Sequence, residues 1–318
     1  MNEDNKTITA YKGFDKNMKC RGFQYEVGKE YEMDGDIECC ERGFHACESP
    51  MEVWDYYDML TSRFAEVEQS GKIDKGDCST KVCSSHIKIK AELKLADIIR
   101  LGIEWIKDVT SPLKVKSTGK INDNGGDYAK IGSSGYSAKI GSSGYSAQIG
   151  SSGYYAQIGS SGDSAQIGSS GDYAQIGSSG DYAKIGSSGY YAKIGSSGYY
   201  AQIGSSGDSA QIGSSGDSAQ IGSSGDYAKI GSSGDYAKIG SSGYSAKIYS
   251  TGDSSVIMCA GKDSIAKAKI GSWITLSEWK QNEDGIYIPK CVKTECVDGE
   301  RIKADTWYRL EDGEFKEV

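Results

Sequence analysis

The stretch of sequence that decides the fold runs from Asp127 to Ile248 and repeats one nine-residue phrase. Residues 162–170 (GDSAQIGSS) and 225–233 (GDYAKIGSS) are two copies of it, and Ile and Ala each recur at every ninth position along the stretch. A short and fixed period of this kind indicates a repeat architecture, in which each unit buries its apolar face against its neighbours.

The phrase suits a β-strand followed by a turn. Ala and Ile lie two residues apart, so both point to one face of a strand, while the Lys or Gln between them and the Tyr or Ser before them point to the other face. The Gly-Ser-Ser-Gly run supplies the turn, and we expect its two glycines to take positive φ angles. An α-helix is excluded because two glycines and two serines in nine residues lower helix propensity too far.

The length of the repeat determines how the strands stack. Because nine is an odd number, the Ala and Ile of a continuous strand would point to opposite faces in successive repeats. The turn between strands must therefore reset the alternation of apolar and polar positions. Two units per coil, about 18 residues, predict a flattened two-sided β-solenoid with a thin core of Ala and Ile. Three units per coil stays open, although Ala is small for a triangular interior. A flexible Gly/Ser linker is the other alternative, but a linker does not keep Ile and Ala in phase through thirteen intact copies of Ile-Gly-Ser-Ser-Gly.

The fold class predicted is therefore mainly β, and the chain divides into four segments. These are an α+β N-terminal domain at 1–112, a connector at 113–126, the nonapeptide solenoid at 127–257 and a β-rich C-terminal cap at 258–318. Alternation of apolar and polar residues in the first segment, as in 86–93 (HIKIKAEL), predicts half-buried strands. A cap is expected because the open end of a solenoid leaves an edge strand that invites another chain.

Composition narrows the function classes. The 318 residues carry a net charge of −8, yet the repeat region holds eight Asp against seven Lys, so it lacks the basic stripe that nucleic-acid binding needs. No run of 18 apolar residues exists, and no membrane span is expected. The first residues (MNEDNK) show no secretory signal, and the nine cysteines are an odd number. Reduced thiols and a cytoplasmic location are therefore expected.

Metal binding is the first chemistry to weigh. The candidate ligands fall into two groups, which are Cys39, Cys40, His45 and Cys47, and then Cys78, Cys83 and His86. Neither group has the paired Cys-x2-Cys spacing of a zinc site, and buried thiols acting as small apolar residues explain them more simply. Stacked Asp columns in the solenoid would need lysines or calcium beside them, but the Gly-Gly-x-Gly-x-Asp phrase of calcium-binding nonapeptides is absent. No metal and no cofactor are predicted.

Both flanks of the repeat resemble a known family. Residues 11–14 (YKGF), 20–29 (CRGFQYEVGK) and 42–48 (RGFHACE) resemble an uncharacterised domain of phage and bacterial proteins. Members of that family often continue into repeats rich in Gly, Ser and Ala, and they share an ending like residues 302–308 (IKADTWY). The resemblance implies a phage or prophage origin, with the host cytoplasm as the location, and it implies no chemistry.

A second resemblance offers an enzymatic alternative. The order of residues 43–46 (GFHA), Tyr57 and Glu68 is similar to that in ADP-ribosyltransferases. The resemblance implies that Arg21 or His45 grips the dinucleotide, that Tyr57 stacks on nicotinamide, and that Glu68 stabilises an oxocarbenium-like transition state. The chain departs from that family because it has no His-Gly or Arg-Gly-Thr strand and because the spacings are compressed. Glu on the solvent face of a strand is the simpler interpretation.

The outward tyrosines suggest the leading function. Eight tyrosines occupy the position before Ala, namely Tyr128, Tyr155, Tyr173, Tyr182, Tyr191, Tyr200, Tyr227 and Tyr236. Ladders of exposed aromatic rings indicate a contact surface, although stacking that merely stabilises the repeat would produce the same pattern. We therefore predict a non-enzymatic binding or scaffold protein. Its partner would be a second copy, giving a homo-oligomer and most simply a dimer, or a host component, such as a defence protein, that it sequesters.

Overall fold

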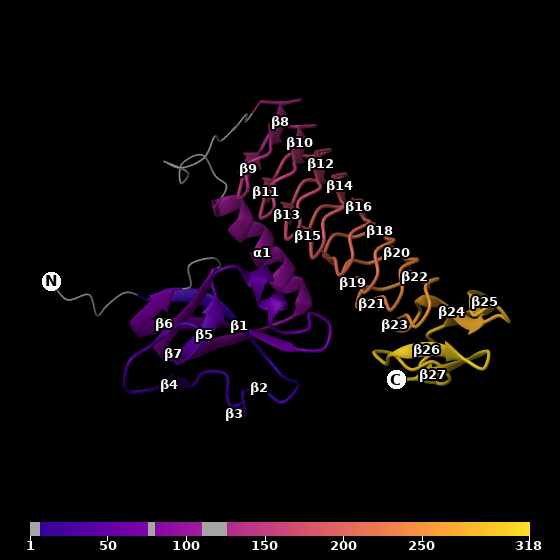
Figure 1. The fold of residues 1–318 in the computed structure, drawn as a ribbon, viewed down its shortest axis with the longest axis horizontal. Coiled ribbons are helices and arrows are strands. Elements are labelled where there is room, and N and C mark those ends of the chain that lie inside the picture. The colour runs from indigo at the N-terminus through magenta and orange to yellow at the C-terminus, as the bar shows by residue number, and fades with distance from the viewer. Residues whose placement is uncertain (1–6, 76–79, 110–125) are drawn as a thin grey trace. The chain divides into compact units, whose positions relative to one another are not determined.

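The computed structural model describes residues 7–75, 80–109 and 126–318 (Figure 1). The chain forms two compact units, residues 1–105 and 106–318, with the division inside helix α1 (Leu95–Val109). Within the described ranges, no helix is long and apolar enough to cross a membrane.

The N-terminal unit is built on one antiparallel sheet. Its strands follow the order β4-β7-β5-β1-β6, and a further pairing of β6 with β7 closes four of them into a ring. The strands are β1 (Ile8–Phe14), β4 (Glu30–Glu32), β5 (Phe44–Cys47), β6 (Arg63–Lys75) and β7 (Lys81–Leu93). A short hairpin of β2 (Lys19–Cys20) and β3 (Phe23–Gln24) and a 3-10 helix η1 (Pro50–Asp55) complete the unit before α1.

Alternation along the strands produces the core of this unit. Phe14, Val67, Ile87 and Ile89 are all buried within one cluster, at 0% exposure each. Their polar neighbours in sequence lie on the other face of the strands, as the alternating pattern predicts. The sequence-based expectation of a small α+β unit before the repeat is confirmed.

The repeat folds as the two-sided β-solenoid that its period predicts. Strands with even numbers from β8 to β22 form one parallel sheet, and strands with odd numbers from β9 to β23 form the other, as the stacked coils in Figure 1 show. Each Ile lies beside the Ile 18 residues further on, as in the pair Ile149 and Ile167, so one coil contains two units. The alternative of three units per coil is excluded.

Each repeat strand covers four residues of the phrase, from Lys or Gln to the first Ser. The strands are β8 (Lys130–Ser133), β9 (Lys139–Ser142), β10 (Gln148–Ser151), β11 (Gln157–Ser160), β12 (Gln166–Ser169), β13 (Gln175–Ser178), β14 (Lys184–Ser187), β15 (Lys193–Ser196), β16 (Gln202–Ser205), β17 (Gln211–Ser214), β18 (Gln220–Ser223), β19 (Lys229–Ser232), β20 (Lys238–Ser241) and β21 (Lys247–Ser250). Two less regular strands follow, β22 (Val256–Cys259) and β23 (Ile265–Lys267).

The core of the solenoid contains a third residue type besides Ile and Ala. The repeat Ile side chains from Ile131 to Ile248 are at most 4% exposed, and the repeat Ala side chains from Ala147 to Ala246 are fully buried, as predicted. The first Ser of each repeat also points inward, because it lies two residues after Ile on the same strand. Several of these hydroxyls, among them those of Ser178, Ser196 and Ser214, have no hydrogen-bond partner in the structure. The interior is therefore partly polar, which the apolar pattern alone did not indicate.

The turn obtains its positive φ from a residue that is not glycine, so our expectation for the two glycines is wrong. The residue before Ala takes φ between 52° and 58° in most repeats, as in Tyr200 and Ser218, and no described repeat glycine does. The second glycine of the Gly-Ser-Ser-Gly run, which opens the next phrase, is required for a different reason. A Cβ at Gly198 would lie 2.0 Å from the carbonyl oxygen of Gly180 in the preceding coil. Close approach of successive coils therefore selects glycine there.

Antiparallel hairpins close the last coil. Strand β24 (Trp273–Gln281) continues one sheet in parallel with β22 and then pairs antiparallel with β25 (Tyr287–Cys296). Strand β26 (Tyr308–Glu311) meets β23 of the other sheet and pairs with β27 (Glu314–Glu317). Both sheets thus end in a hairpin that covers the parallel edge.

Candidate functional site

The turns hold their shape through aspartate side chains. Where the residue after the glycine that opens the phrase is Asp, its Oδ1 accepts a hydrogen bond from the backbone N–H 18 residues further on, at 2.7–2.9 Å. The acceptors are Asp127, Asp163, Asp172, Asp181, Asp208, Asp217, Asp226 and Asp235. The carboxylates of the Asp column therefore bind amide donors, and Lys269 also forms an ion pair with Asp253 at 2.5 Å.

The eight tyrosines before Ala are divided between the two edges of the solenoid, where its turns lie. We call the turns before β8, β10 and the other even strands the first edge, and the turns before the odd strands the second edge. The first edge carries Tyr128, Tyr182, Tyr200 and Tyr236, and the second carries Tyr155, Tyr173, Tyr191 and Tyr227. Seven of the eight side chains are exposed, from 41% at Tyr155 to 68% at Tyr128.

A continuous group of rings forms on the second edge only. This tyrosine cluster consists of Tyr136, Tyr154, Tyr155, Tyr173, Tyr190 and Tyr191, which come from four successive coils. Tyr136 stacks on Tyr154 with ring centroids 5.4 Å apart, and Tyr173 stacks on Tyr191 at 5.1 Å; each pair lies 18 residues apart, which is the length of one coil. Tyr154 and Tyr155 also approach Tyr173 at 5.4 Å each, so that the stacks merge.

Rings on the first edge form separate pairs. Tyr128 meets Tyr145 edge-on at 5.8 Å, and Tyr182 stacks on Tyr200 at 5.2 Å. Between these pairs the coil at residues 163–164 carries Asp and Ser, so no ring bridges them. The two edges share one backbone and differ in which repeats contain Tyr.

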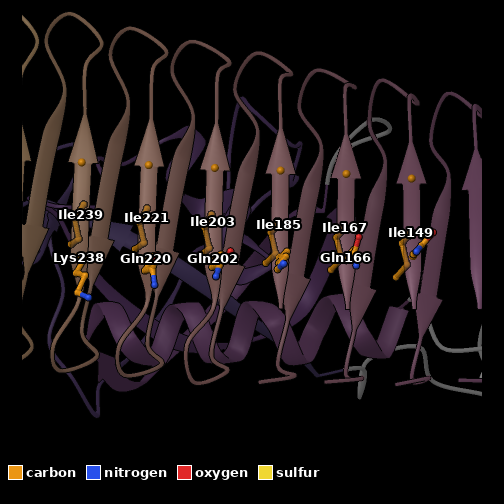
Figure 2. Close-up of a pocket in the computed structure, with 18 of the residues that line it drawn as sticks. Ile149, Gln166, Ile167, Ile185, Gln202, Ile203, Gln220, Ile221, Lys238 and Ile239 are labelled. Carbon is orange, nitrogen blue, oxygen red and sulfur yellow. The ribbon is translucent and has the colours of Figure 1, made fainter. Parts of the chain in front are cut away.

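A shallow groove of about 1320 Å³ runs along the outer face of the even-numbered sheet (Figure 2). Its polar row is formed by the residue before each Ile, namely Lys130, Gln148, Gln166, Lys184, Gln202, Gln220 and Lys238. The glycine after each Ile faces open space, as at Gly186 and Gly204. No side chain therefore fills the groove at the glycine positions. No acidic residue is among the described residues that line it.

The N-terminal unit contains a separate pocket of about 930 Å³. Arg21, His45 and Tyr57 all line it, so the fold brings together three of the four residues of the enzymatic alternative. Glu68 does not line the pocket: it lies on β6 and forms an ion pair with Lys90 at 3.3 Å. The carboxylate that the transferase resemblance would need is therefore outside the pocket that holds its supposed partners.

The pocket also holds an uncommon buried lysine that sequence reasoning missed. Lys12 is only 4% exposed, and its Nζ donates a hydrogen bond to the carbonyl oxygen of His45 at 2.7 Å. Burial lowers the pKa of Lys12, and nearby Cys20 acts in the opposite direction. Tyr57 in turn donates to Cys20 Sγ at 2.9 Å, and burial raises the pKa of this tyrosine. The only sign of this in the sequence is the position of Lys12 within strand β1, whose residues are mostly buried.

His45 is held in its neutral form. Burial lowers its pKa to about 4, and the charges of Lys81, Lys12 and Arg21 act in the same direction. Its Nε2 accepts a hydrogen bond from the backbone N–H of Cys40 at 2.9 Å. At neutral pH the imidazole therefore serves as a hydrogen-bond acceptor that anchors a loop, and its Nε2 is already engaged.

The cysteines associate across the two groups seen in the sequence. Ligand atoms of Cys39, Asp74 and Cys83 lie within 4.8 Å of one another, so one residue of each group meets a carboxylate that neither group contains. Cys40, Cys47, His45 and His86 do not belong to this set, and Cys78 lies outside the described residues. Burial raises the pKa of the Cys83 thiol to about 12, and a hydrogen bond with Cys39 adds to this.

Comparison with known proteins gives a match over the N-terminal unit. A search of the curated proteins gave no match to the chain, and a search of the solved structures gave none either. One family model matches, over residues 8–101, which covers the strands β1 to β7 and the first part of α1. This part of the chain is therefore similar to a family described as a domain of unknown function (DUF7666), as the motifs of the N-terminal flank suggested.

Proposed function

We propose that the protein is a non-enzymatic binding protein in which the solenoid is a rigid scaffold and the tyrosine cluster is the contact surface for a protein. The observation that carries this proposal is the continuity of six rings over four successive coils of one edge. The first edge has the same backbone but only separate ring pairs.

Several properties of the cluster support a role in binding. Five of its six side chains are between 36% and 66% exposed, namely Tyr136, Tyr154, Tyr155, Tyr190 and Tyr191. Tyrosine provides a large contact area and a hydroxyl at a low cost in side-chain entropy, so it is enriched at protein interfaces. The in-register parallel strands beneath the rings fix their spacing, which reduces the ordering that a partner would have to impose.

A second copy of the chain is the partner we propose first, because a repetitive face can be complementary to itself under two-fold symmetry. A host component sequestered on the same rings is the alternative. The proposal includes a cytoplasmic location and a phage origin. The eight cysteines among the described residues form no disulfide with one another, which supports the former, and the family resemblance supports the latter.

The test exploits serine, which already occupies the equivalent turn position in other repeats, for example at Ser209 and Ser245. A triple variant, Tyr155→Ser, Tyr173→Ser and Tyr191→Ser, removes rings from the cluster. A matched triple variant, Tyr182→Ser, Tyr200→Ser and Tyr236→Ser, removes as many rings from the first edge. Sedimentation equilibrium at tens of micromolar should show a dimer for the wild type and the first-edge variant, and a monomer for the cluster variant.

A wild-type monomer at these concentrations would reject self-association. The cluster would then keep a binding role only if the wild type and the first-edge variant captured the same host protein and the cluster variant did not. Equal behaviour of the two triple variants in both experiments would reject the tyrosine cluster as a contact surface.

A further inference from the structure

Three segments of the N-terminal unit converge at Cys39, Asp74 and Cys83. Asp74 and Cys83 are direct cross-strand partners in the antiparallel pair β6–β7, so their side chains leave the sheet on the same face. Cys39 comes from a tight loop that two backbone hydrogen bonds between Glu38 and Arg42 close, each 2.9 Å long. The loop thus places its cysteine over two strands that lie 35 and 44 residues further along the chain.

The spacing of the three side chains fits a metal ion. One ligand atom from each residue lies within 4.8 Å of the other two. Thiolates bound to zinc at about 2.3 Å in a tetrahedron are about 3.8 Å apart, so only a small adjustment of rotamers would be needed to reach that geometry. Cys83 is buried while Cys39 and Asp74 are partly exposed, so a cation could enter from the solvent side.

Neighbouring groups already orient the ligands. The backbone N–H of Cys39 donates to Asp74 Oδ2 at 2.7 Å, and that of Lys75 donates to Oδ1 at 3.0 Å. Each carboxylate oxygen still has a lone pair for a cation. Gly43 closes the far side, where a Cβ would lie 3.2 Å from Cys83 Sγ. Support of this kind from second-layer contacts is typical of metal ligands in proteins.

We propose that Cys39, Asp74 and Cys83 form a binding site for a thiophilic divalent cation, for which zinc fits the donor set best. Two thiolates favour zinc over magnesium or calcium, and the carboxylate supplies a third ligand. Each thiol releases its proton to solvent as it coordinates, and a water molecule completes the tetrahedron. His45 is the partner of Cys83 on β5, and its bond to the Cys40 N–H makes it a support of the loop rather than a ligand.

Cobalt(II) tests the site directly because thiolate ligation produces a charge-transfer band in the near ultraviolet. Reduced full-length protein should bind one Co²⁺ with this band, and added Zn²⁺ should displace it. The variants Cys39→Ser and Cys83→Ser should lose the band, and Asp74→Asn should weaken the affinity at least about tenfold. The matched control is Cys40→Ser, which changes the adjacent cysteine of the same loop and should keep the wild-type band.

Thermal unfolding separates metal loss from misfolding. Zn²⁺ should raise the melting temperature of the wild type and of Cys40→Ser, and it should leave Cys39→Ser unchanged. Should Cys83→Ser not fold, Cys39→Ser and Asp74→Asn decide the question, because both positions are partly exposed. The proposal is overturned if reduced wild type shows no thiolate band. It is equally overturned if Cys39→Ser binds Co²⁺ as the wild type does or if Cys40→Ser abolishes the band.

Discussion

In the solenoid, residues 18 apart hold the same position in successive coils, whereas in the N-terminal unit the side chains that meet come from distant segments. Tyr136 and Tyr154 stack because the repeat places them there, as it places every other residue of the phrase. Cys39, Asp74 and Cys83 meet only because a loop folds over two paired strands. Differences in side chains on the constant backbone of the solenoid can therefore distinguish one edge from the other. The cluster of Cys39, Asp74 and Cys83 in the N-terminal unit depends instead on long-range contacts.

The largest effect is expected from a charge in the solenoid core. Ile185→Asp places an unpaired carboxylate at a position that is 3% exposed and should lower the free energy of unfolding by about 4 kcal/mol. Lys184→Asp changes the neighbouring outward residue and should cost less than about 0.5 kcal/mol. Chemical denaturation measures both. Hydrogen exchange should show loss of protection in the coils around residue 185, and unchanged protection in peptides from residues 8–75. Equal stability of the two variants would contradict the assignment of Ile185 to the core and of Lys184 to the outer face.

The two glycines of the phrase should respond differently to the same methyl group. Gly198→Ala introduces a Cβ 2.0 Å from the oxygen of Gly180, so coils must separate, at a cost of about 2–3 kcal/mol. Gly204→Ala meets no atom within 4 Å and should be neutral or slightly stabilising. Melting temperatures of the pair decide the matter. If Gly198→Ala were tolerated as well as Gly204→Ala, close approach of coils would not explain the invariance of glycine along the repeat.

Acid should lower the stability of the N-terminal unit over a pH range that the pKa of His45 sets. Because its folded pKa of about 4 lies below the ordinary value of 6.5, the unfolded chain binds the proton more readily. Stability is therefore expected to fall as the pH drops from about 6.5 to about 4, by about 2 kcal/mol after allowance for solvent screening. Hydrogen exchange of residues 8–75 at several pH values measures this, and His45→Gln should flatten the dependence. Both histidines of the chain precede the repeat, so peptides from residues 127–248 are the internal control.

The smallest effect is expected from the turn aspartates. Asp208→Ala removes the acceptor for the N–H of Asp226, a hydrogen bond of 2.9 Å, and should cost about 1 kcal/mol. Asp208→Asn keeps a side-chain oxygen in the same place and should lose less than half of that. Other repeats carry Tyr at this position, so the solenoid should remain folded in both variants. Equal losses for Ala and Asn would mean that the carboxylate contributes charge rather than a hydrogen-bond acceptor.

Much of the solenoid could be predicted because a period is a property of the chain itself. The nine-residue interval keeps Ile and Ala in phase, and the odd number forces the turn to reset the alternation, so two strands per coil follow. The stacking of Tyr136 on Tyr154 follows from the same arithmetic. Periodicity does not reveal which residue takes the strained turn conformation. Tyr200 and Ser218 take it, whereas glycine occupies the position where successive coils approach too closely for a Cβ.

The sequence by itself determined the solenoid, its buried Ile and Ala rows and the likeness of the N-terminal flank to an uncharacterised family. Only the tertiary structure decided that Glu68 lies outside the pocket of Arg21, His45 and Tyr57, and that Cys39 joins Cys83. The register of β6 against β7 shifts after Glu66 and shifts back between Ser70 and Ile73, so Asp74 lies opposite Cys83 in the same register as Phe64 opposite Leu93. Cys39 reaches this pair from a loop 35 residues before Asp74, and such a contact depends on how distant segments pack together, so no spacing along the chain reveals it.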